Sequence, residues 1–598
     1  MAQSQHQIRK IAKDLLATDY SGAPAVIRRL LNASDRARLL YVCARAYMSD
    51  WRLPEALALS EESIATQGTT SAYLLCSEIH SFIGNPVSAI ECAKAASALD
   101  PLDATSIQQL KSLSAPEADK MLSVDEISTE IEHRDRAPEA IFAATRLLIH
   151  YGRCTEAISF LASALDAFQE EDFVAEMNFW HGYALENQRR FAQALHHYAQ
   201  CKQGKMARRS LKGTAICLME LGHHEEAEQV FNKIHELDGK PGGFDSSWRG
   251  LKLRQGQFKE AWLSYRRREI STALRNYVGG RYCQSLTSLA DVAEVLLLAE
   301  GGPGDEICFA STYPELVQRL RNLTVTCEPR LSSLLARNFP SVRFLSVARW
   351  RPQFPGSYYA QCDRVKRRIL ADFINNDAQH HAERVDAFCS VFDVLADLRP
   401  DVEAFPRRQK YLNARPDLVD TWRGRIAHHT FGNLPQVALS WRSLLRDVRR
   451  DAHYLGASDF SPLADLPAEF WLFQPCLEPQ ETTVLKRLLP KVHVPEGLDM
   501  RDDFEGMAAF LANMDFVVSP CTTNAELAGA LGVRTLLFVG TEAAKWRKQE
   551  DESDLWHANV RIVSGTPLGD RASTAAAIRD ALDREITAAV GDWLSRSA

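Results

Sequence analysis

The chain has 598 residues and a formal net charge of −7, with 46% hydrophobic and 25% charged residues. This length exceeds what one hydrophobic core supports, so we expect about three or four domains. The composition is that of a folded globular protein and excludes a long disordered tract. The acidic balance argues against broad nucleic-acid binding, which leaves a basic footprint, so we expect no nucleic-acid partner.

Thirteen cysteines are scattered along the chain without a paired framework, and no CxxC pair occurs. We interpret them as reduced side chains that fill the core. The polar segment 1–13 has no apolar run of signal length. No window approaches the roughly 20 apolar residues that a membrane span needs. We therefore expect a cytoplasmic protein with no membrane span.

The first half of the chain contains an internal repeat. Ala194, Ala227 and Ala261 follow one another at steps of 33 and 34 residues, each inside a similar helical pattern. A glycine stands five residues before most of these alanines, and another small residue often stands twelve before. We count six units between roughly residues 36 and 270, with an irregular insert around 102–135. Their alanines are Ala56, Ala89, Ala157, Ala194, Ala227 and Ala261.

Each unit reads as a helix hairpin. The glycine permits the turn between the two helices, and the small residues let the helices approach closely. One hairpin cannot bury its apolar face alone, so the units are expected to stack. The period and pattern resemble the tetratricopeptide repeat. Such an array forms a concave surface that commonly holds a peptide or protein; the alternative is a purely structural or dimerising array.

The second half alternates strands and helices. Apolar runs at 293–300, 322–328 and 342–347 predict three buried parallel strands. We place helices and the crossover between two lobes in the segment 348–433, with helical stretches at 362–376 and 382–398. The second series of expected strands is 436–441, 471–475, 491–496, 515–520, 534–540 and 561–565. This order predicts two doubly wound sheets.

Four stretches carry a family resemblance. They are GQFKEAWLSYRRR (256–268), LLLAEGGPGDEICFAS (296–311), ALSWRSLLRD (438–447) and DDFEGMAAFLANMDFVVSPCTTNAELAGALGVRTLLFVG (502–540). Together they resemble bacterial tetratricopeptide-repeat glycosyltransferases. The second stretch is also similar to the "GD" loop of heptosyltransferases, and the fourth to the O-GlcNAc transferases. The resemblance covers roughly residues 40–270 and 290–560.

The resemblance implies an α superhelix of repeats followed by a two-lobed α/β region of GT-B type. On this basis we divide the chain into a repeat superhelix (1–285), an acceptor-side lobe with the crossover (286–433) and a nucleotide-sugar lobe (434–598). It further implies an inverting, metal-independent glycosyltransferase that uses a nucleotide-sugar as substrate and needs no cofactor. No aspartate–x–aspartate metal motif lies in a plausible nucleotide loop, and we predict no metal site.

The acceptor implied by the repeats is a protein. The combination also resembles the bacterial flagellin glycosyltransferases that carry repeats at the N-terminus, which would make Ser or Thr of flagellin the acceptor. Two alternatives stay open. The heptosyltransferase likeness favours a glycan or lipopolysaccharide acceptor. Departures from the family pattern leave room for an inactive scaffold that only binds a partner.

Asp305 is the candidate catalytic residue. The loop Gly301, Gly302 and Gly304 follows a strand and opens a helix, where glycines let the backbone approach a ligand and the helix start favours an anion. Asp305 matches the aspartate that heptosyltransferases use as general base, which would take the proton of the acceptor hydroxyl. The alternative is that Asp305 caps the helix. By the resemblance, the loop belongs to the acceptor side, as does His453.

The candidate donor-binding residues follow strands of the second series. Arg442 stands just beyond a strand, where its guanidinium would neutralise a diphosphate; alternatively it pairs with a carboxylate. The start of the helix after residue 522 offers hydroxyls and free N–H groups for an anion. Cys521 and Glu526 depart from the bacterial pattern, although a carboxylate at the latter point binds ribose in O-GlcNAc transferases. The full donor set is Ser440, Arg442, Gln474, Cys521, Thr522, Thr523 and Glu526.

Overall fold

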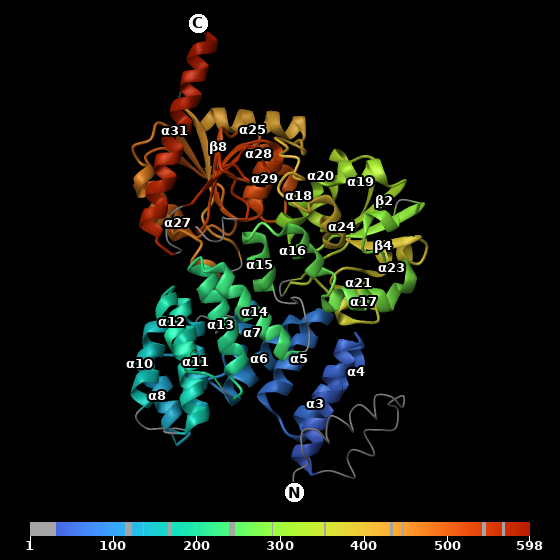
Figure 1. Cartoon of the computed structure of the whole chain (residues 1–598), viewed down its shortest axis with the longest axis vertical. Coiled ribbons are helices and arrows are strands. Elements are labelled where there is room, and N and C mark those ends of the chain that lie inside the picture. The colour runs from blue at the N-terminus through green and yellow to red at the C-terminus, as the bar shows by residue number, and fades with distance from the viewer. Residues whose placement is uncertain are drawn as a thin grey trace. The chain divides into compact units, whose positions relative to one another are not determined.

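The computed structural model describes residues 32–113, 122–135, 137–165, 170–202, 204–238, 246–289, 291–351, 354–430, 434–444, 448–540, 546–564 and 569–597. The chain forms two compact units (Figure 1). One comprises residues 1–184 and 347–384, and the other comprises 185–346 and 385–598. These units group the chain differently from the three-part division expected above, which stays a prediction.

The repeat region contains the expected helix pairs. They are α3 (Ala33–Ser49) with α4 (Leu53–Thr66), α5 (Thr70–Ile83) with α6 (Pro86–Leu99), α9 (Pro138–His150) with α10 (Cys154–Leu165), α11 (Glu171–Asn187) with α12 (Phe191–Tyr198), α13 (Ala207–Glu220) with α14 (His224–Leu237), and α15 (Ser246–Arg254) with α16 (Phe258–Tyr265). Two short helices, α7 (Ala104–Ser112) and α8 (Val124–Glu132), lie in the irregular insert. This confirms the tetratricopeptide-type architecture.

The residues that define the repeat have the expected local structure. Gly84, Gly152, Gly222 and Gly256 have φ of 84°, 76°, 84° and 73°, the left-handed region that glycine enters without strain. The six repeat alanines are all fully buried in their hairpins. Four of the six hairpins are thus closed by a glycine turn, whereas Trp51 and Arg189 take the left-handed conformation, with φ of 61° and 65°, in the turns of α3/α4 and α11/α12.

An insertion leaves the α/β region and packs on the first repeats. Residues 347–384 carry α21 (Tyr358–Cys362), α22 (Arg368–Ala371) and α23 (Asn376–Ala382). The Trp51 indole N–H donates to the carbonyl of Cys362 over 2.9 Å, and its ring lies edge-on to Tyr358 and Phe82. This burial of a tryptophan and a tyrosine orders the insertion on α3 and α5.

The second unit contains two all-parallel sheets. The first has the order β3-β2-β1-β4, built from β1 (Glu294–Leu298), β2 (Asn322–Cys327), β3 (Val342–Ser346) and β4 (Ala387–Ser390). The second has the order β10-β9-β8-β5-β6-β7, built from β5 (Gln436–Leu439), β6 (Glu469–Leu472), β7 (Val492–His493), β8 (Phe516–Pro520), β9 (Arg534–Phe538) and β10 (Val560–Val563). The latter is the doubly wound order 3-2-1-4-5-6 read from the other end.

The expected strands are confirmed, with one correction. β4 lies inside the stretch 382–398 that we expected to be helical throughout; only α24 (Val391–Leu398) is helix there. β4 pairs with β1 through Val295–Ala387 and Leu297–Cys389, and all four residues of β4 are buried. Four apolar residues flanked by residues that favour a helix are too few to show the two-residue period of a strand or the 3.6-residue period of a helix.

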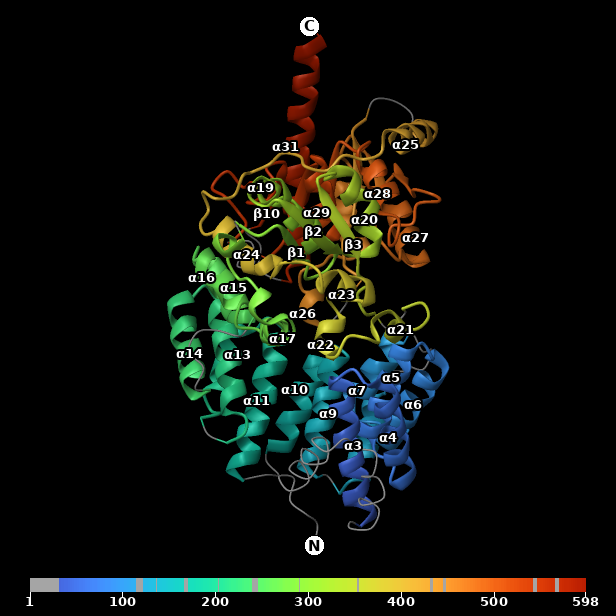
Figure 2. The ribbon, with the colours of Figure 1, turned by 90° about the vertical axis from the view of Figure 1, so that its right-hand side faces the viewer.

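The last repeat joins the first lobe through one core. Phe258 and Trp262 of α16 pack with residues of α24 and of both sheets in a continuous apolar cluster, and Figure 2 shows α16 beside α24. The Trp262 indole N–H donates to the carbonyl of Arg399 over 2.9 Å, and the Tyr265 ring stacks on Phe392 at 3.9 Å. The motif at 256–268 therefore docks the last repeat onto the lobe that contains Asp305.

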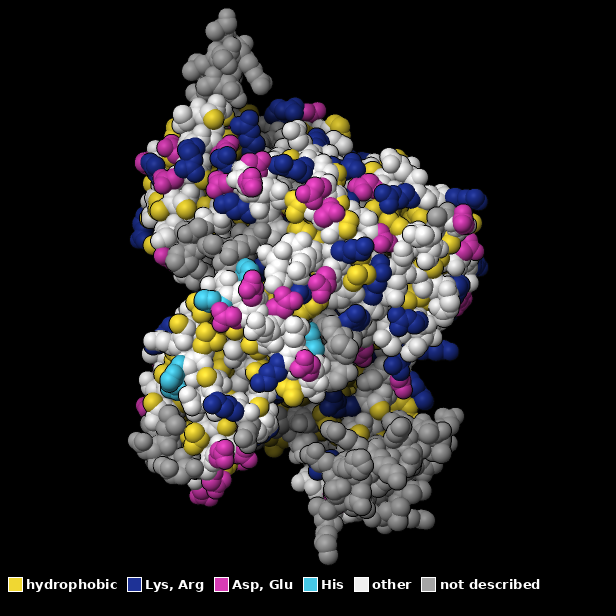
Figure 3. All heavy atoms as spheres, viewed as in Figure 1, with side chains coloured by type: hydrophobic (Ala, Val, Ile, Leu, Met, Phe, Trp, Pro, Cys, Tyr) yellow, Lys and Arg dark blue, Asp and Glu magenta, His cyan; other side chains and the backbone are white. Residues whose placement is uncertain are grey.

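The surface is mixed in charge. On the face shown in Figure 3, basic and acidic side chains are interspersed. Within the described residues, no helix is both long enough and apolar enough to cross a lipid bilayer.

Candidate functional site

The site is defined by the points where each sheet reverses its winding. In an open parallel sheet, ligands bind outside the carboxyl ends of the two central strands that lead in opposite directions. In the second lobe these strands are β5 and β8, which pair directly through Ala438–Val517 and Leu439–Val518. Ser440 follows β5 and Cys521 follows β8. The winding therefore brings two segments of the expected donor set to one crevice.

The Asp305 loop comes from the other lobe. Gly301 has φ of 92°, and a Cβ there would lie 2.5 Å from Asp305 Oδ2, so this position requires glycine. The Gly302 N–H donates to Asp305 Oδ2 over 2.8 Å at the start of α18 (Pro303–Ala310). Asp305 therefore does cap the helix, but with one oxygen only. Among the described residues, Oδ1 accepts no hydrogen bond, and the side chain is exposed.

The electrostatic surroundings favour proton uptake by Asp305. The surrounding protein partly shields the carboxylate from water, and this desolvation raises the pKa of Asp305 above the usual range. The negative charge of Glu526 raises it further. The Gly302 N–H and the Arg547 guanidinium act in the opposite direction and are outweighed. A carboxylate with a raised pKa is a stronger base, which is the property that proton abstraction needs.

Two helix starts from different lobes are in contact. A Cβ built on Gly304 would lie 3.2 Å from both Cα and Oγ1 of Thr523, the first residue of α29 (Thr523–Leu531). Helices α18 and α29 pack together, as Figure 1 shows. The absence of a side chain at Gly304 thus lets the Asp305 loop of one lobe touch the start of α29 in the other.

The start of α29 has backbone N–H groups that form no hydrogen bond within the described residues. Thr522 is the N-cap, and its carbonyl accepts from the N–H groups of Ala525 and Glu526 at 3.0 and 3.2 Å. The Thr522 hydroxyl lies 3.2 Å from the Ser519 hydroxyl. The N–H groups of Thr523 and Asn524 donate to no group that the structure describes. Free donors at a helix start attract an anionic group.

Ser440 and Gln474 form a buried polar network. The Gln474 side-chain oxygen accepts from the N–H of Trp441 at 2.9 Å and of Arg442 at 3.1 Å, and its amide group donates to the Arg442 carbonyl at 3.0 Å. The Asn524 amide donates to the Ser440 hydroxyl over 3.0 Å. Gln474 and Ser440 are fully buried. They hold the ends of β5 and β6 and the first turn of α29 in one arrangement.

Arg442 is paired, which was the alternative left open. Its Nε and Nη2 donate to the two carboxylate oxygens of Glu481 at 2.9 and 2.6 Å, and Nη2 also reaches the Cys476 carbonyl at 3.0 Å. Only 6% of the Arg442 side chain is exposed. Glu481 lies on α27 (Pro479–Leu488). The guanidinium thus anchors the loop after β5, and its contact with a donor phosphate stays a prediction.

Glu526 belongs to a buried ion network that the motifs did not indicate. Arg547 pairs with Glu526 Oε1 and with Asp554 Oδ1, each at 2.6 Å, and His557 Nε2 lies 2.8 Å from Glu526 Oε2. All four side chains are at least nine-tenths buried. Burial raises the Glu526 pKa, but Arg547 and His557 outweigh it and bring the value to about 2. Both Glu526 oxygens are therefore occupied, and a ribose contact stays a prediction.

Close packing positions this network. A Cβ on Gly529 would lie 2.6 Å from His557 Cγ, so only glycine lets the imidazole reach Glu526. The Tyr411 ring stacks on the His557 ring at 5.8 Å, and its hydroxyl donates to the Ile307 carbonyl over 2.9 Å. Cys521 is exposed and borders the network through Arg547, 3.6 Å from its sulfur. The surrounding protein raises the Cys521 pKa to about 11.

One group in this network has metal-ligating atoms. Those of Cys308, Glu526 and His557 lie within 4.8 Å of one another and are buried. The Arg547 guanidinium already occupies the position of a cation at Glu526. Burying a second positive charge beside it would be unfavourable, so the group does not fit a metal ion.

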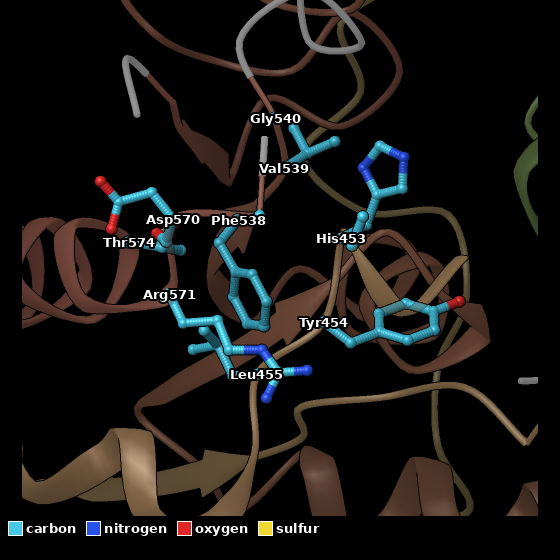
Figure 4. Close-up of a pocket in the computed structure, with 11 residues that line it drawn as sticks. His453, Tyr454, Leu455, Phe538, Val539, Gly540, Asp570, Arg571 and Thr574 are labelled. Atoms are coloured by element: carbon cyan, nitrogen blue, oxygen red, sulfur yellow. Dashed lines mark hydrogen bonds between the residues drawn. The ribbon is translucent and has the colours of Figure 1, made fainter. Parts of the chain in front are cut away.

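His453 lies elsewhere in the second lobe. It borders a pocket with Tyr454 and Leu455, the end of β9, and the start of α31 (Arg571–Ser597), where Arg571 points into the pocket (Figure 4). No residue of the loop 301–305 lines this pocket. Burial lowers the His453 pKa, and Arg189 and Arg254 lower it further against the effect of Glu220. The structure therefore does not bring His453 and Asp305 together in one pocket.

Several side chains of the site were missed from sequence. Asn524, Glu481, Arg547 and His557 contact expected site residues, and Asp554 holds Arg547 in place. The first two stand inside helices whose amphipathic pattern explains them as ordinary surface or core positions. The other three stand in residues 546–557, which carry no motif. Only the buried polar character that the fold gives them reveals their role.

No family model matches the chain. Protein FlbA of Caulobacter vibrioides is 29% identical over 322 residues, which are 52% of this chain and 50% of FlbA. The chain thus aligns with about half the length of that relative.

Two solved structures align over nearly their whole length. The ADP-heptose lipopolysaccharide heptosyltransferase II of E. coli is 12% identical and covers 51% of this chain and 100% of its own, with a TM-score of 0.35. A Thermobaculum terrenum O-GlcNAc transferase mutant is 12% identical and covers 93% of this chain and 98% of its own, with a TM-score of 0.26. At these low scores, the fold described above rests on the strand order and helices of this chain.

Proposed function

We propose that the chain is an inverting glycosyltransferase that moves a sugar from a nucleotide-sugar to a protein acceptor. The observation that carries the proposal is the meeting of two elements across the cleft. Asp305 has a raised pKa and one carboxylate oxygen without a hydrogen bond, and its loop contacts the start of α29. The N–H groups of that helix start lie beyond β8, one of the two strands at which the second sheet reverses its winding. A base and an anion site thus face the same space from two lobes.

The chemistry assigned to these groups is a single displacement. The acceptor hydroxyl oxygen attacks the anomeric carbon, and the bond from that carbon to the nucleotide phosphate oxygen breaks. Asp305 takes the proton of the hydroxyl. The first turn of α29, at Thr523 and Asn524, stabilises the negative charge that develops on the departing phosphate. The motif resemblance at 296–311 and 502–540 supports both assignments.

On this proposal the repeats recruit the acceptor, and flagellin is the acceptor that the repeat motifs suggest. The last repeat packs on the lobe of Asp305 through Trp262 and Tyr265. A protein bound by the repeats would therefore lie near Asp305, which supports a protein acceptor. The proposed reaction needs no metal ion. A glycan acceptor is the second candidate, favoured by the "GD" loop alone.

The test uses the purified full-length chain and a panel of UDP-, ADP- and CMP-sugars. A donor that binds the native state raises the unfolding temperature, and that donor is then used for transfer to flagellin or to a lipopolysaccharide core, with and without EDTA. We expect Asp305→Asn to lower turnover by roughly 10²–10⁴ while donor affinity and stability are kept. Asparagine can still accept the Gly302 N–H bond.

Asp503→Asn is the matched control. Asp503 is also a helix-capping aspartate, and it accepts from the Gly506 N–H over 2.8 Å at the start of α28 (Phe504–Leu511). Its replacement should leave turnover unchanged. Full activity of a folded Asp305→Asn enzyme would refute the base role. Absence of any donor that stabilises the protein would instead support the scaffold alternative.

A further inference from the structure

A group of three metal-ligating side chains lies in the second repeat, far in sequence from the cleft. Cys76 and His80 are four residues apart on α5, so they lie on the same face of the helix. Cys92 lies on α6, the other helix of the hairpin. One ligand atom from each residue lies within 4.8 Å of the other two.

The surroundings suit a cation. Cys76 and His80 are buried, Cys92 is half-buried, and His80 Nδ1 is a buried atom without a hydrogen-bond partner among the described residues. A buried imidazole nitrogen without a partner is costly unless something binds it. Ligand atoms of a tetrahedral zinc site are about 3.5–3.8 Å apart, given bond lengths near 2.1–2.3 Å, so small side-chain rotations close the site.

We propose that Cys76, His80 and Cys92 form a zinc site that joins α5 to α6. Two thiolates and one neutral imidazole match the ligand preference of Zn²⁺. The two thiolate charges neutralise the ion, so the complex enters the half-buried hairpin without net charge. The three side chains leave one of the four positions of a tetrahedral ion to water or another ligand.

The charge of neighbouring groups is consistent with this assignment. Glu61 of α4 is exposed, and its carboxylate lies near enough to act electrostatically on Cys76, His80 and Cys92. A negative potential at all three groups is unfavourable for two thiolates alone and favourable for a bound cation. Zinc binding releases thiol protons, so affinity should increase with pH.

The site would stabilise the end of the repeat array that holds the insertion. Phe82 follows His80 by two residues, and its ring packs on Trp51 and on Trp350 of the insertion, at 5.2 and 4.6 Å. A metal at His80 fixes the last turn of α5, which presents Phe82. The metal is therefore structural, and it is independent of the transfer reaction proposed above.

The experiment uses the full-length chain, purified with a reductant, stripped with EDTA and dialysed. Titration calorimetry should find one Zn²⁺ per chain at this site, and thermal melting should shift to higher temperature. Co²⁺ used in place of zinc should give thiolate-to-metal absorption. Cys92→Ser and His80→Gln should each weaken Zn²⁺ binding by about 100-fold, the upper end of what losing even an outer-shell partner causes.

Cys476→Ser is the matched control, because it removes an exposed thiol of the other unit and should leave zinc binding unchanged. Cys92 is only half-buried, so its serine variant is expected to fold, which circular dichroism checks. Three results would overturn the proposal: no zinc binding by the reduced wild type, equal binding by folded Cys92→Ser, or a Cys76–Cys92 disulfide that persists under reductant.

Discussion

The crevice at the carboxyl ends of β1 and β4 and the crevice at the ends of β5 and β8 occupy equivalent points of their sheets. In the first, the Glu300 carboxylate accepts a hydrogen bond from Ser390 and from Arg268, whose Nη2 lies 2.8 Å away. Arg268 follows the last repeat helix, so the repeat region itself fills this crevice. In the second, Ser440 and Asn524 bond beneath the surface and leave the helix start accessible.

The difference shows that winding alone does not determine where a ligand binds. Both sheets have the order 3-2-1-4 at their centre, and the general rule would place a ligand at either. Arg268 supplies a partly buried positive charge to one crevice and fills it. Ligand chemistry is left to the other crevice and to the Asp305 loop that contacts it.

The largest stability effect is expected in the second lobe. Arg547→Met leaves Glu526 and Asp554 buried without their partner, which should cost about 3–5 kcal/mol. Urea denaturation measures the free energy of unfolding. Arg423→Met, which breaks an exposed pair with Asp420, is the control and should be neutral. Equal stability of the two variants would show that the network is not structural.

A smaller effect is expected from the filled crevice. Arg268→Met removes the guanidinium from Glu300, but the Ser390 hydroxyl still donates to that carboxylate. We expect a loss of about 1.5–3 kcal/mol, typical of a hydrogen bond to a charged group. The same denaturation series measures it. A loss as large as that of Arg547→Met would mean that the crevices are held equally strongly, against the comparison above.

Variants of the Arg442–Glu481 pair can distinguish a structural role of Arg442 from a role in donor binding. A double-mutant cycle with Arg442→Ala and Glu481→Gln should give a coupling of about 0.5–3 kcal/mol in unfolding free energy. If Arg442 also binds donor, calorimetry should find weaker donor affinity for Arg442→Ala even in the Glu481→Gln background. Zero coupling in stability would contradict the pairing at 2.6 and 2.9 Å.

The pH dependence of rate and stability should differ in the same cleft. Asp305, with its pKa raised above 3.8, becomes a base only as pH increases through that pKa, so the acid limb of the rate profile lies above 3.8. Glu526, with its pKa lowered to about 2 from 4.5, contributes stability above 4.5 that is lost as pH falls towards 2. Activity should therefore disappear before the fold does. Coincident loss of rate and circular dichroism signal would count against the base role.

The sequence predicted what depends on periodicity. The repeats and nine of the ten strands follow from spacing and apolar runs, because each of those elements has one dominant pattern. β4 lacked such a pattern, and the pairing of Arg442 depends on Glu481, which stands in a later helix. The network of Glu526 needs residues 547, 554 and 557, which only the folded chain brings to one point. Side chains that only the fold brings together have no fixed spacing in the sequence, so sequence patterns cannot predict their contacts.

The insertion between β3 and β4 has a consequence for synthesis. Trp51 of the first repeat bonds to Cys362, 311 residues later. At about 5–20 residues per second, a ribosome needs roughly 15–60 s to produce that partner. Throughout this time the nascent first repeats expose the aromatic surface that the insertion will cover. The first repeats therefore finish folding late, although they are made first, and a chaperone that protects aromatic surfaces would act on them before the second lobe exists.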